Sequence, residues 1–174
     1  MALAVAAQAT RTLRFGTLVL DNDFRHPTVL AKEAATLNLL TDGRFEIGLG
    51  PYASAHTHRR AWAANAAQAA READIIGVTG SDESRDERMA LIRAEAGERY
   101  RLIEFNTLYM RVQVDGQPEQ GGSAYSDLAG LMGSRSAVIE YLPQQRELVD
   151  ISYVVIIGSA IDAFAPVVAT LAGR

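Results

Sequence analysis

The chain has 174 residues, of which 48% are hydrophobic and 22% are charged, and its formal net charge is −4. These values are ordinary for a globular domain with room for a core. They give no electrostatic footprint for nucleic acid or an anionic membrane. The absence of cysteine excludes disulfides, thiolate metal sites and a cysteine nucleophile.

The N-terminal residues form an apolar run from Met1 to Ala7. No basic region precedes this run, so we expect a helix that reaches about Thr10 rather than a signal peptide. Nowhere does an apolar run approach the ~20 residues that cross a bilayer. A cytoplasmic location is therefore expected.

A strand, a helix and a second strand are predicted between Leu13 and Gly50. The first strand runs from Leu13 to Leu20 and ends at a turn of Asp21, Asn22 and Asp23. Pro27 suits the first turn of a helix, since its missing N–H would be unpaired there. The residue before it, His26, is expected to cap this helix. One face of the helix carries apolar residues at helical spacing: Leu30, Ala34, Leu37 and Leu40.

The sequence Asp42-Gly43 predicts the end of this helix, because glycine adopts the left-handed conformation at little cost. Phe45 to Leu49 is the second strand. Two strands joined by one crossover helix form a βαβ unit, which predicts a parallel sheet.

The rest of the chain continues to alternate between helices and strands. A loop from Pro51 is followed by a helix with an alanine-rich inner face and by a buried strand at 74–78. Ser84 and Glu87 have capping-box spacing at the start of the next helix. We further expect a long strand at 102–114, helices at about 125–132 and 136–149 (bent or split at Pro143), a fully buried strand at 151–157, and a terminal helix from Phe164.

Four blocks in this N-terminal region resemble the luciferase-like flavin monooxygenases, particularly the branch that uses the deazaflavin coenzyme F420. They are Leu13-Arg14-Phe15-Gly16-Thr17-Leu18-Val19-Leu20, Asp23-Phe24-Arg25-His26-Pro27, Leu30-Ala31-Lys32-Glu33-Ala34-Ala35-Thr36-Leu37 and Gly43-Arg44-Phe45-Glu46-Ile47-Gly48-Leu49-Gly50. Three later stretches, 69–78, 151–155 and 162–169, are similar to the C-terminal half of the same family.

The resemblance implies an eight-stranded (β/α) barrel, which takes about 250 residues. With about five βα units, this chain is expected to be a shortened barrel or an opened parallel sheet with flanking helices, in a single domain over 1–174. The family's first strands and a central block after Gly50 have no counterpart in the sequence. Open edges and apolar helix faces predict a homodimer or larger assembly.

For the site, the resemblance implies that FMN or F420 lies at the carboxyl ends of the strands. The cofactor would contact a bulged segment with a strained or cis peptide bond at Thr17, Leu18 and Val19, and its phosphate would approach Gly48, Gly50 and Pro51. The positions after Gly50 do not match the family's catalytic groups, so no catalytic residue is assigned. Two functions stay open: a flavin- or deazaflavin-dependent oxidoreductase of a small organic substrate, and a non-catalytic cofactor-binding or structural remnant.

Other residues suggest weaker alternatives. His56 and His58 lack a third metal ligand nearby, so no metal site is predicted. The glycine loop 48–54, followed by Arg59 and Arg60, could hold a phosphate through backbone N–H groups or could be a plain tight turn. Ser159 and Asp162 have no nucleophile elbow, and we do not expect them to form a catalytic triad.

Overall fold

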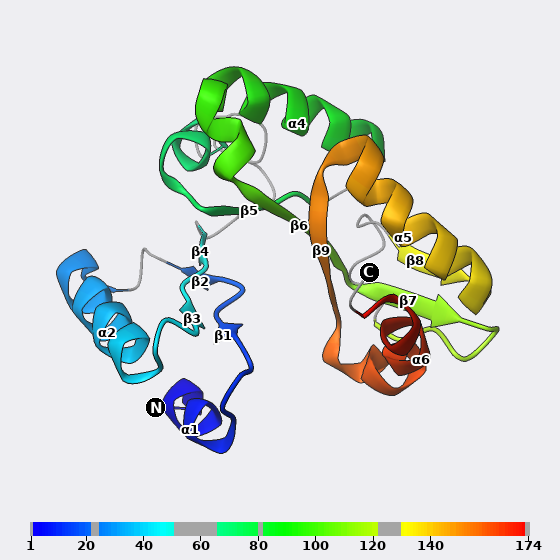
Figure 1. Cartoon of the computed structure of the whole chain (residues 1–174), viewed down its shortest axis with the longest axis horizontal. Coiled ribbons are helices and arrows are strands. Elements are labelled where there is room, and N and C mark those ends of the chain that lie inside the picture. The colour runs from blue at the N-terminus through cyan, green and yellow to red at the C-terminus, as the bar shows by residue number, and fades with distance from the viewer. Residues whose placement is uncertain (1, 22–24, 51–65, 80–81, 122–129, 173–174) are drawn as a thin grey trace. The chain divides into compact units, whose positions relative to one another are not determined.

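The computed structural model describes residues 2–21, 25–50, 66–79, 82–121 and 130–172. The chain divides into two compact units, residues 1–58 and residues 59–174. Each unit has its own helices and parallel strands (Figure 1). The single domain expected from the sequence stays a prediction.

Unit 1 contains the predicted βαβ arrangement, preceded by a helix. Its elements are α1 (Ala2–Ala9), β1 (Phe15–Gly16), β2 (Leu20–Asp21), α2 (Pro27–Leu40), β3 (Phe45–Glu46) and β4 (Leu49–Gly50). Strand β1 pairs in parallel with β3, and β2 pairs in parallel with β4. The parallel pairing and the N-terminal helix are thus confirmed.

Helix α2 follows the sequence signals closely. The Nδ1 atom of His26 accepts a hydrogen bond from the backbone N–H of Thr28, so His26 is the N-cap, as predicted. Asp42 and Gly43, just beyond the helix, both have positive φ angles. Along the predicted inner face, Leu30 is buried, Ala34 and Leu37 are half-buried and Leu40 is exposed, so the face is less covered toward the C-terminal end of the helix.

Unit 2 is larger and contains the remaining described elements. They are a helical segment at 66–72, β5 (Ile75–Gly77), α4 (Asp82–Ala96), the 3₁₀ helix η2 (Gly97–Leu102), β6 (Glu104–Tyr109), β7 (Arg111–Val114), β8 (Gly130–Gly133), α5 (Arg135–Val149), β9 (Ile151–Ile156), the 3₁₀ helix η4 (Gly158–Ala160) and α6 (Ile161–Leu171). Strands β5, β6 and β9 form a parallel sheet with β6 in the centre, and β7 pairs in parallel with β8.

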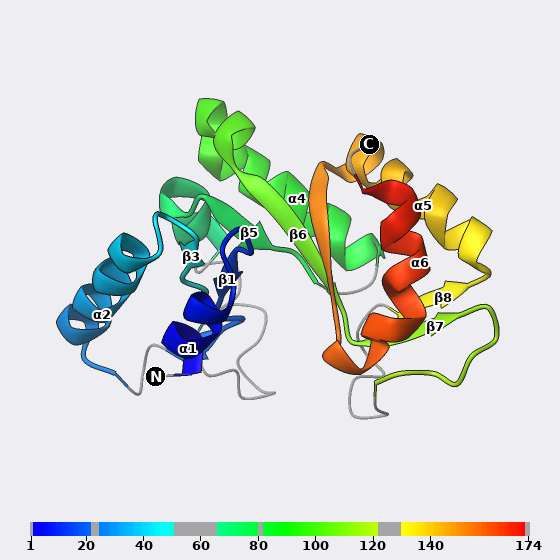
Figure 2. The same cartoon turned by 60° about the horizontal axis from the view of Figure 1, so that its bottom comes forward.

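Two clusters of buried apolar side chains stabilise unit 2. The first joins segment 66–72 and α4 to the three-stranded sheet, and its alanine contacts include the buried Ala66 and Ala70. The second joins α5 and α6 to β7 and β8 through residues such as Val138, Phe164 and Val112. Helices α5 and α6 contact each other and lie side by side in Figure 2. The alanine-rich inner face predicted for the first helix of this unit is confirmed.

The prediction of one long strand at 102–114 is wrong, because this stretch forms two shorter strands. The 3₁₀ helix η2 ends at Leu102, and β6 and β7 are separate strands on either side of Met110. The chain changes sheet at this point, because β6 pairs with β5 and β9 whereas β7 pairs with β8. Sequence alternation persists through the change, which is why the pattern resembled one strand.

The helix expected at about 125–132 is contradicted where the structure describes it. Residues 130–133 form strand β8 instead, with Leu131 buried against β7. Gly130 and Gly133 disfavour a helix here, because glycine is a poor helix former. The segment 122–129 lies outside the described residues.

Three smaller predictions compare as follows. Helix α4 begins at Asp82, so Ser84 is inside the helix and the predicted N-cap is wrong. Of the bend or split predicted at Pro143, the split is wrong, since α5 continues through that residue, and the bend stays a prediction. Strand β9 is only partly buried, because its sheet face near Tyr153 is exposed.

The observed class is therefore α/β with parallel sheets. The described residues do not form a closed barrel. Among these residues, no helix has the combination of length and apolar character that would let it cross a membrane.

Candidate functional site

A β-bulge interrupts the strand pairing of unit 1 at the position where the sequence predicted one. Gly16 pairs with Glu46, and Leu20 pairs with Leu49. Between these two pairs, the segment from Gly16 to Leu20 advances by four residues, whereas the segment from Glu46 to Leu49 advances by three. One extra residue on one of two paired strands defines a bulge. The peptide bond between Leu18 and Val19, within the bulge, is cis.

The Thr17 side chain fills the gap in the hydrogen-bond ladder. Its Oγ1 accepts a hydrogen bond from the Gly48 N–H at 2.9 Å and donates one to the Gly48 carbonyl oxygen at 2.9 Å. On one side of this contact, the Thr17 N–H donates to the Glu46 carbonyl at 3.2 Å. On the other side, the Leu20 N–H donates to the Gly48 carbonyl at 2.8 Å. The bulge is thus held by side-chain and backbone bonds together.

The close approach of the two chains requires glycine at position 48. A Cβ atom there would overlap the Thr17 carbonyl oxygen. At Gly50, an added Cβ would lie 2.6 Å from Cγ2 of Val19. The glycines of this segment therefore serve to bring two backbones together, which is one established reason for glycine next to a bulge.

Three apolar side chains next to the bulge are exposed. Leu18, Val19 and Leu49 have exposed fractions of 56%, 54% and 53%. Neighbouring exposed apolar side chains commonly mark a surface that a ligand or a partner covers. Of the six residues predicted to bind a cofactor, Thr17, Leu18, Val19, Gly48 and Gly50 lie together here. The sixth, Pro51, lies outside the described residues.

Arg44 is an important residue of unit 1 that sequence reasoning missed. Its guanidinium donates hydrogen bonds to the carbonyl oxygens of Ala7, Leu13 and Thr41, and to Oγ1 of Thr10, at 3.0 to 3.3 Å. It also lies over the Phe15 ring, 5.5 Å from the ring centroid. A single side chain therefore connects the end of α1, the start of β1 and the end of α2.

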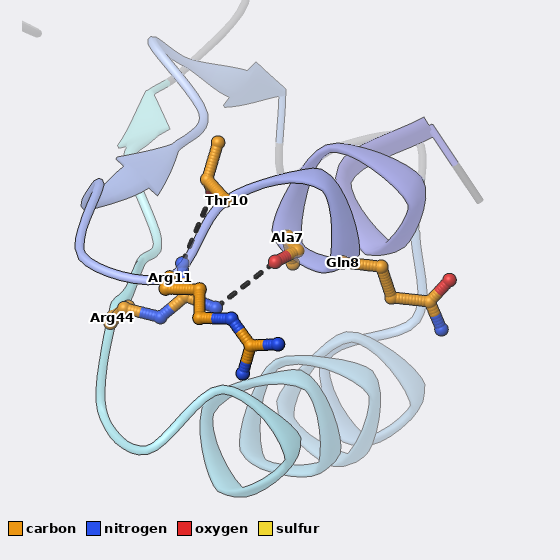
Figure 3. Close-up of a pocket in the computed structure, with 5 residues that line it drawn as sticks. All are labelled: Ala7, Gln8, Thr10, Arg11 and Arg44. Carbon is orange, nitrogen blue, oxygen red and sulfur yellow. Dashed lines mark hydrogen bonds between the residues drawn. The ribbon is translucent and has the colours of Figure 1, made fainter.

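A shallow pocket of about 260 Å³ lies beside Arg44, lined by Ala7, Gln8, Thr10, Arg11 and Arg44 (Figure 3). Dashed lines in Figure 3 show Arg44 reaching Ala7 and Thr10, whereas Arg11 makes no drawn bond. The donors of Arg44 are mostly used by backbone oxygens. The pocket therefore lies next to a side chain whose role is structural. The one sequence feature that could have pointed to Arg44 is its position between Gly43 and Phe45, just before β3.

In unit 2, a polar cluster joins helix α4, η2 and the end of α5. The hydroxyl of Tyr100 donates to Oδ2 of Asp150 at 2.7 Å, and Arg93 contacts both groups. Burial, with a smaller contribution from the hydrogen bond to Asp150, raises the pKa of the Tyr100 hydroxyl. Tyr100 also packs against Phe105, with ring centroids 5.2 Å apart. These contacts hold α4, η2 and the end of α5 together, and we assign the cluster a structural role.

The remaining sequence candidates contribute no second site. His56, His58, Arg59 and Arg60, and the loop beyond Gly50, lie outside the described residues. Within the described ranges, there is no group of three or more His, Cys, Asp or Glu side chains that could hold a metal ion. The predicted cap His26 uses its imidazole for helix α2.

One comparison with known proteins concerns this same N-terminal segment. The family model described as luciferase-like monooxygenase matches residues 1–64. The resemblance to luciferase-like monooxygenases that the sequence predicted is therefore confirmed for this segment.

Two curated proteins are similar to this chain over short stretches. A 4-hydroxyprotoasukamycin monooxygenase of Streptomyces nodosus subsp. asukaensis is 44% identical over 48 residues, which are 28% of this chain and 13% of that protein. A phthiodiolone/phenolphthiodiolone dimycocerosates ketoreductase of Mycobacterium sp. (strain JLS) is 54% identical over 39 residues, which are 22% of this chain and 10% of that protein. The matched stretches thus span a small fraction of either relative.

Proposed function

We propose that this chain binds a flavin-type cofactor, FMN or coenzyme F420, at the bulge of unit 1 and acts as a luciferase-like oxidoreductase on a small organic substrate. The observation that carries this proposal is the bulge itself. It lies within the segment that matches the family, and exposed apolar side chains flank it. The names of the two relatives, a monooxygenase and a ketoreductase, both describe redox enzymes.

The described residues fit such a cofactor through their surface chemistry. Leu18, Val19 and Leu49 offer apolar contact for one face of a flat ring system. The missing Cβ atoms of Gly48 and Gly50 make room for the facing strand, and the Gly48 N–H is already donated to Thr17 Oγ1, so the support from the described residues is the apolar contact. When bound, the cofactor would supply the hydride-transfer chemistry. The chain's own contribution would be to orient the ring and to exclude water from one side of it.

A second candidate function is a non-catalytic cofactor-binding or structural remnant of the family. The hydrogen bonds of Thr17 favour this non-catalytic function. Its hydroxyl lies in the bulge, and both of its hydrogen bonds are made with Gly48. No described residue within the stretches 15–20 and 45–50 is a His, Cys or Lys. A protein of this kind would bind the cofactor and would not turn over.

We also propose that the chain forms a homodimer. The support is the exposed apolar surface of unit 1, which includes Leu39 and Leu40 at the end of α2 as well as the residues around the bulge. Size-exclusion chromatography with light scattering tests this directly. A strictly monomeric species at concentrations of tens of micromolar would contradict it.

Cofactor binding can be tested with the purified chain. FMN and F420 are titrated separately, and binding is followed through the visible spectrum and cofactor fluorescence. We expect saturable binding of one cofactor. Leu18→Glu should weaken this binding at least tenfold, because a carboxylate would replace the apolar contact. Leu13→Glu, which changes a comparably exposed leucine of the same unit (60% exposed against 56% for Leu18), should leave it unchanged.

The two candidate functions are then separated by chemistry. Hydride exchange between the reduced cofactor and an added carbonyl or quinone acceptor supports the oxidoreductase. Binding without exchange supports the remnant. If neither cofactor binds at tens of micromolar, or if both leucine variants behave alike, the proposed site is wrong.

A further inference from the structure

We infer that Thr17 is a positioning residue: its hydroxyl maintains the bulge that carries the cofactor-binding surface, and it does not itself contact the cofactor. This inference rests on the proposed function for its binding consequence. Its structural part stands on the hydrogen bonds of unit 1 alone.

The inference follows from the hydrogen-bond count across the bulge. In a regular parallel pair, backbone carbonyls accept the N–H groups of the neighbouring strand at even spacing. The extra residue on the Thr17 side breaks that spacing, so the Gly48 N–H meets the Thr17 hydroxyl in place of a carbonyl. Gly48 is half-buried, and an unpaired N–H there would carry a desolvation cost.

The same hydroxyl also fixes the next step of the ladder. Thr17 Oγ1 donates to the Gly48 carbonyl, and the Leu20 N–H donates to that same carbonyl. The Gly48 carbonyl is thus shared between the side chain of the bulge and the first residue of β2. Removing the hydroxyl would loosen the register between β2 and β4 on one side of the bulge.

A ligand-facing role for the Thr17 hydroxyl is less consistent with this geometry. One O–H has a single proton, and that proton is already donated to Gly48. The acceptor capacity is partly used by the Gly48 N–H. The flanking residues Leu18 and Val19 are exposed, whereas Thr17 is half-buried between the chains. The hydroxyl therefore acts on the cofactor only through the backbone that it holds.

Three variants test the inference. Thr17→Val removes the hydroxyl at nearly constant shape, and Thr17→Ser retains it. Thr36→Val is the matched control, because its hydroxyl donates to the Lys32 carbonyl on the exposed face of α2. Amide hydrogen exchange at Gly48 and Leu20 reports the local geometry without any cofactor. Circular dichroism confirms that each variant is folded.

We expect exchange at Gly48 and Leu20 to accelerate about fivefold or more in Thr17→Val, as for a lost hydrogen bond, and to be near wild type in Thr17→Ser and Thr36→Val. Cofactor affinity should fall at least tenfold in Thr17→Val and recover in Thr17→Ser. Unchanged exchange in Thr17→Val would overturn the inference.

The binding data distinguish this inference from the proposed function. If the wild-type chain binds neither cofactor, the proposed function fails, and with it the role of Thr17 in binding. The exchange data then still decide whether the hydroxyl maintains the bulge. If exchange responds while cofactor affinity in Thr17→Val equals that of wild type, Thr17 is structural only, and its positioning role is refuted.

Discussion

Replacement of Arg44 should uncouple the N-terminal helix from the strands of unit 1. Arg44 donates four hydrogen bonds, to Ala7, Thr10, Leu13 and Thr41, and packs over Phe15. A hydrogen bond from a charged donor contributes about 1.5–3 kcal/mol when buried, and a cation–π contact contributes about 0.5–1 kcal/mol. These groups are only partly buried, so we expect a total loss of about 2–4 kcal/mol in Arg44→Met.

The assay is urea unfolding followed by circular dichroism, together with amide hydrogen exchange of peptides that cover α1. A loss of this size is comparable with the stability of a small unit, so exchange in α1 should rise at least tenfold. Arg44→Lys should recover less than half of the loss, because an ammonium group cannot reproduce the planar fork of donors. The matched control is Arg11→Met, which changes the same pocket.

Arg11 lines the pocket beside Arg44 and has no hydrogen bond or ion pair among the described residues. Arg11→Met should therefore change the free energy of unfolding by less than about 0.5 kcal/mol. If Arg44→Met and Arg11→Met have the same small effect, the clamp does not hold unit 1 together, and the reasoning from its four acceptors is refuted.

Two further predictions concern backbone packing and pH. Gly48→Ala should lower the melting temperature of unit 1, because the new Cβ would overlap the Thr17 carbonyl oxygen. Gly158→Ala is the control, since its Cβ would enter open space and should leave thermal unfolding unchanged. Equal effects of the two variants would contradict the close approach of Gly48 to Thr17. Because the fold raises the pKa of Tyr100, its contribution to stability is complete below the unfolded pKa of about 10 and is lost as pH rises through the folded value. Between pH 8 and pH 11.5, the melting temperature of wild type should therefore fall more than that of Tyr100→Phe, and parallel curves would contradict this.

Local signals in the sequence were sufficient for much of unit 1. Pro27, the cap at His26 and the Asp42-Gly43 step each act over a few residues, and together they define α2. The parallel pairing follows from the crossover helix that joins the strands. The bulge has no local signal of its own, and it was expected only because the residues around Thr17 resemble a family.

The missed features depend on contacts between residues that are distant in the sequence. Arg44 contacts α1 more than thirty residues earlier in the chain. The change of sheet at Met110 depends on where β8 and β9 pair, although the alternation of apolar residues does not change there. Strand β8 was mistaken for a helix because four residues give too short a pattern for periodicity to distinguish the two.

The two units differ in how many apolar side chains they bury. Unit 2 contains both clusters of buried apolar side chains, whereas the buried described residues of unit 1 are Ala7, Leu30 and Thr41. The described residues of unit 1 are therefore held together by close backbone contact at glycine and by polar bonds from Thr17 and Arg44, more than by a buried apolar core.

Those features constrain sequence strongly, because a Cβ at position 48 would collide with backbone whatever the protein does. The family match over residues 1–64 includes the bulge and its glycines. The reacting groups of an enzyme are a separate requirement, and no catalytic residue is assigned from the sequence. For this reason the decisive measurement on this chain is hydride exchange by a bound cofactor, since binding and fold would be the same for an enzyme and for its non-catalytic remnant.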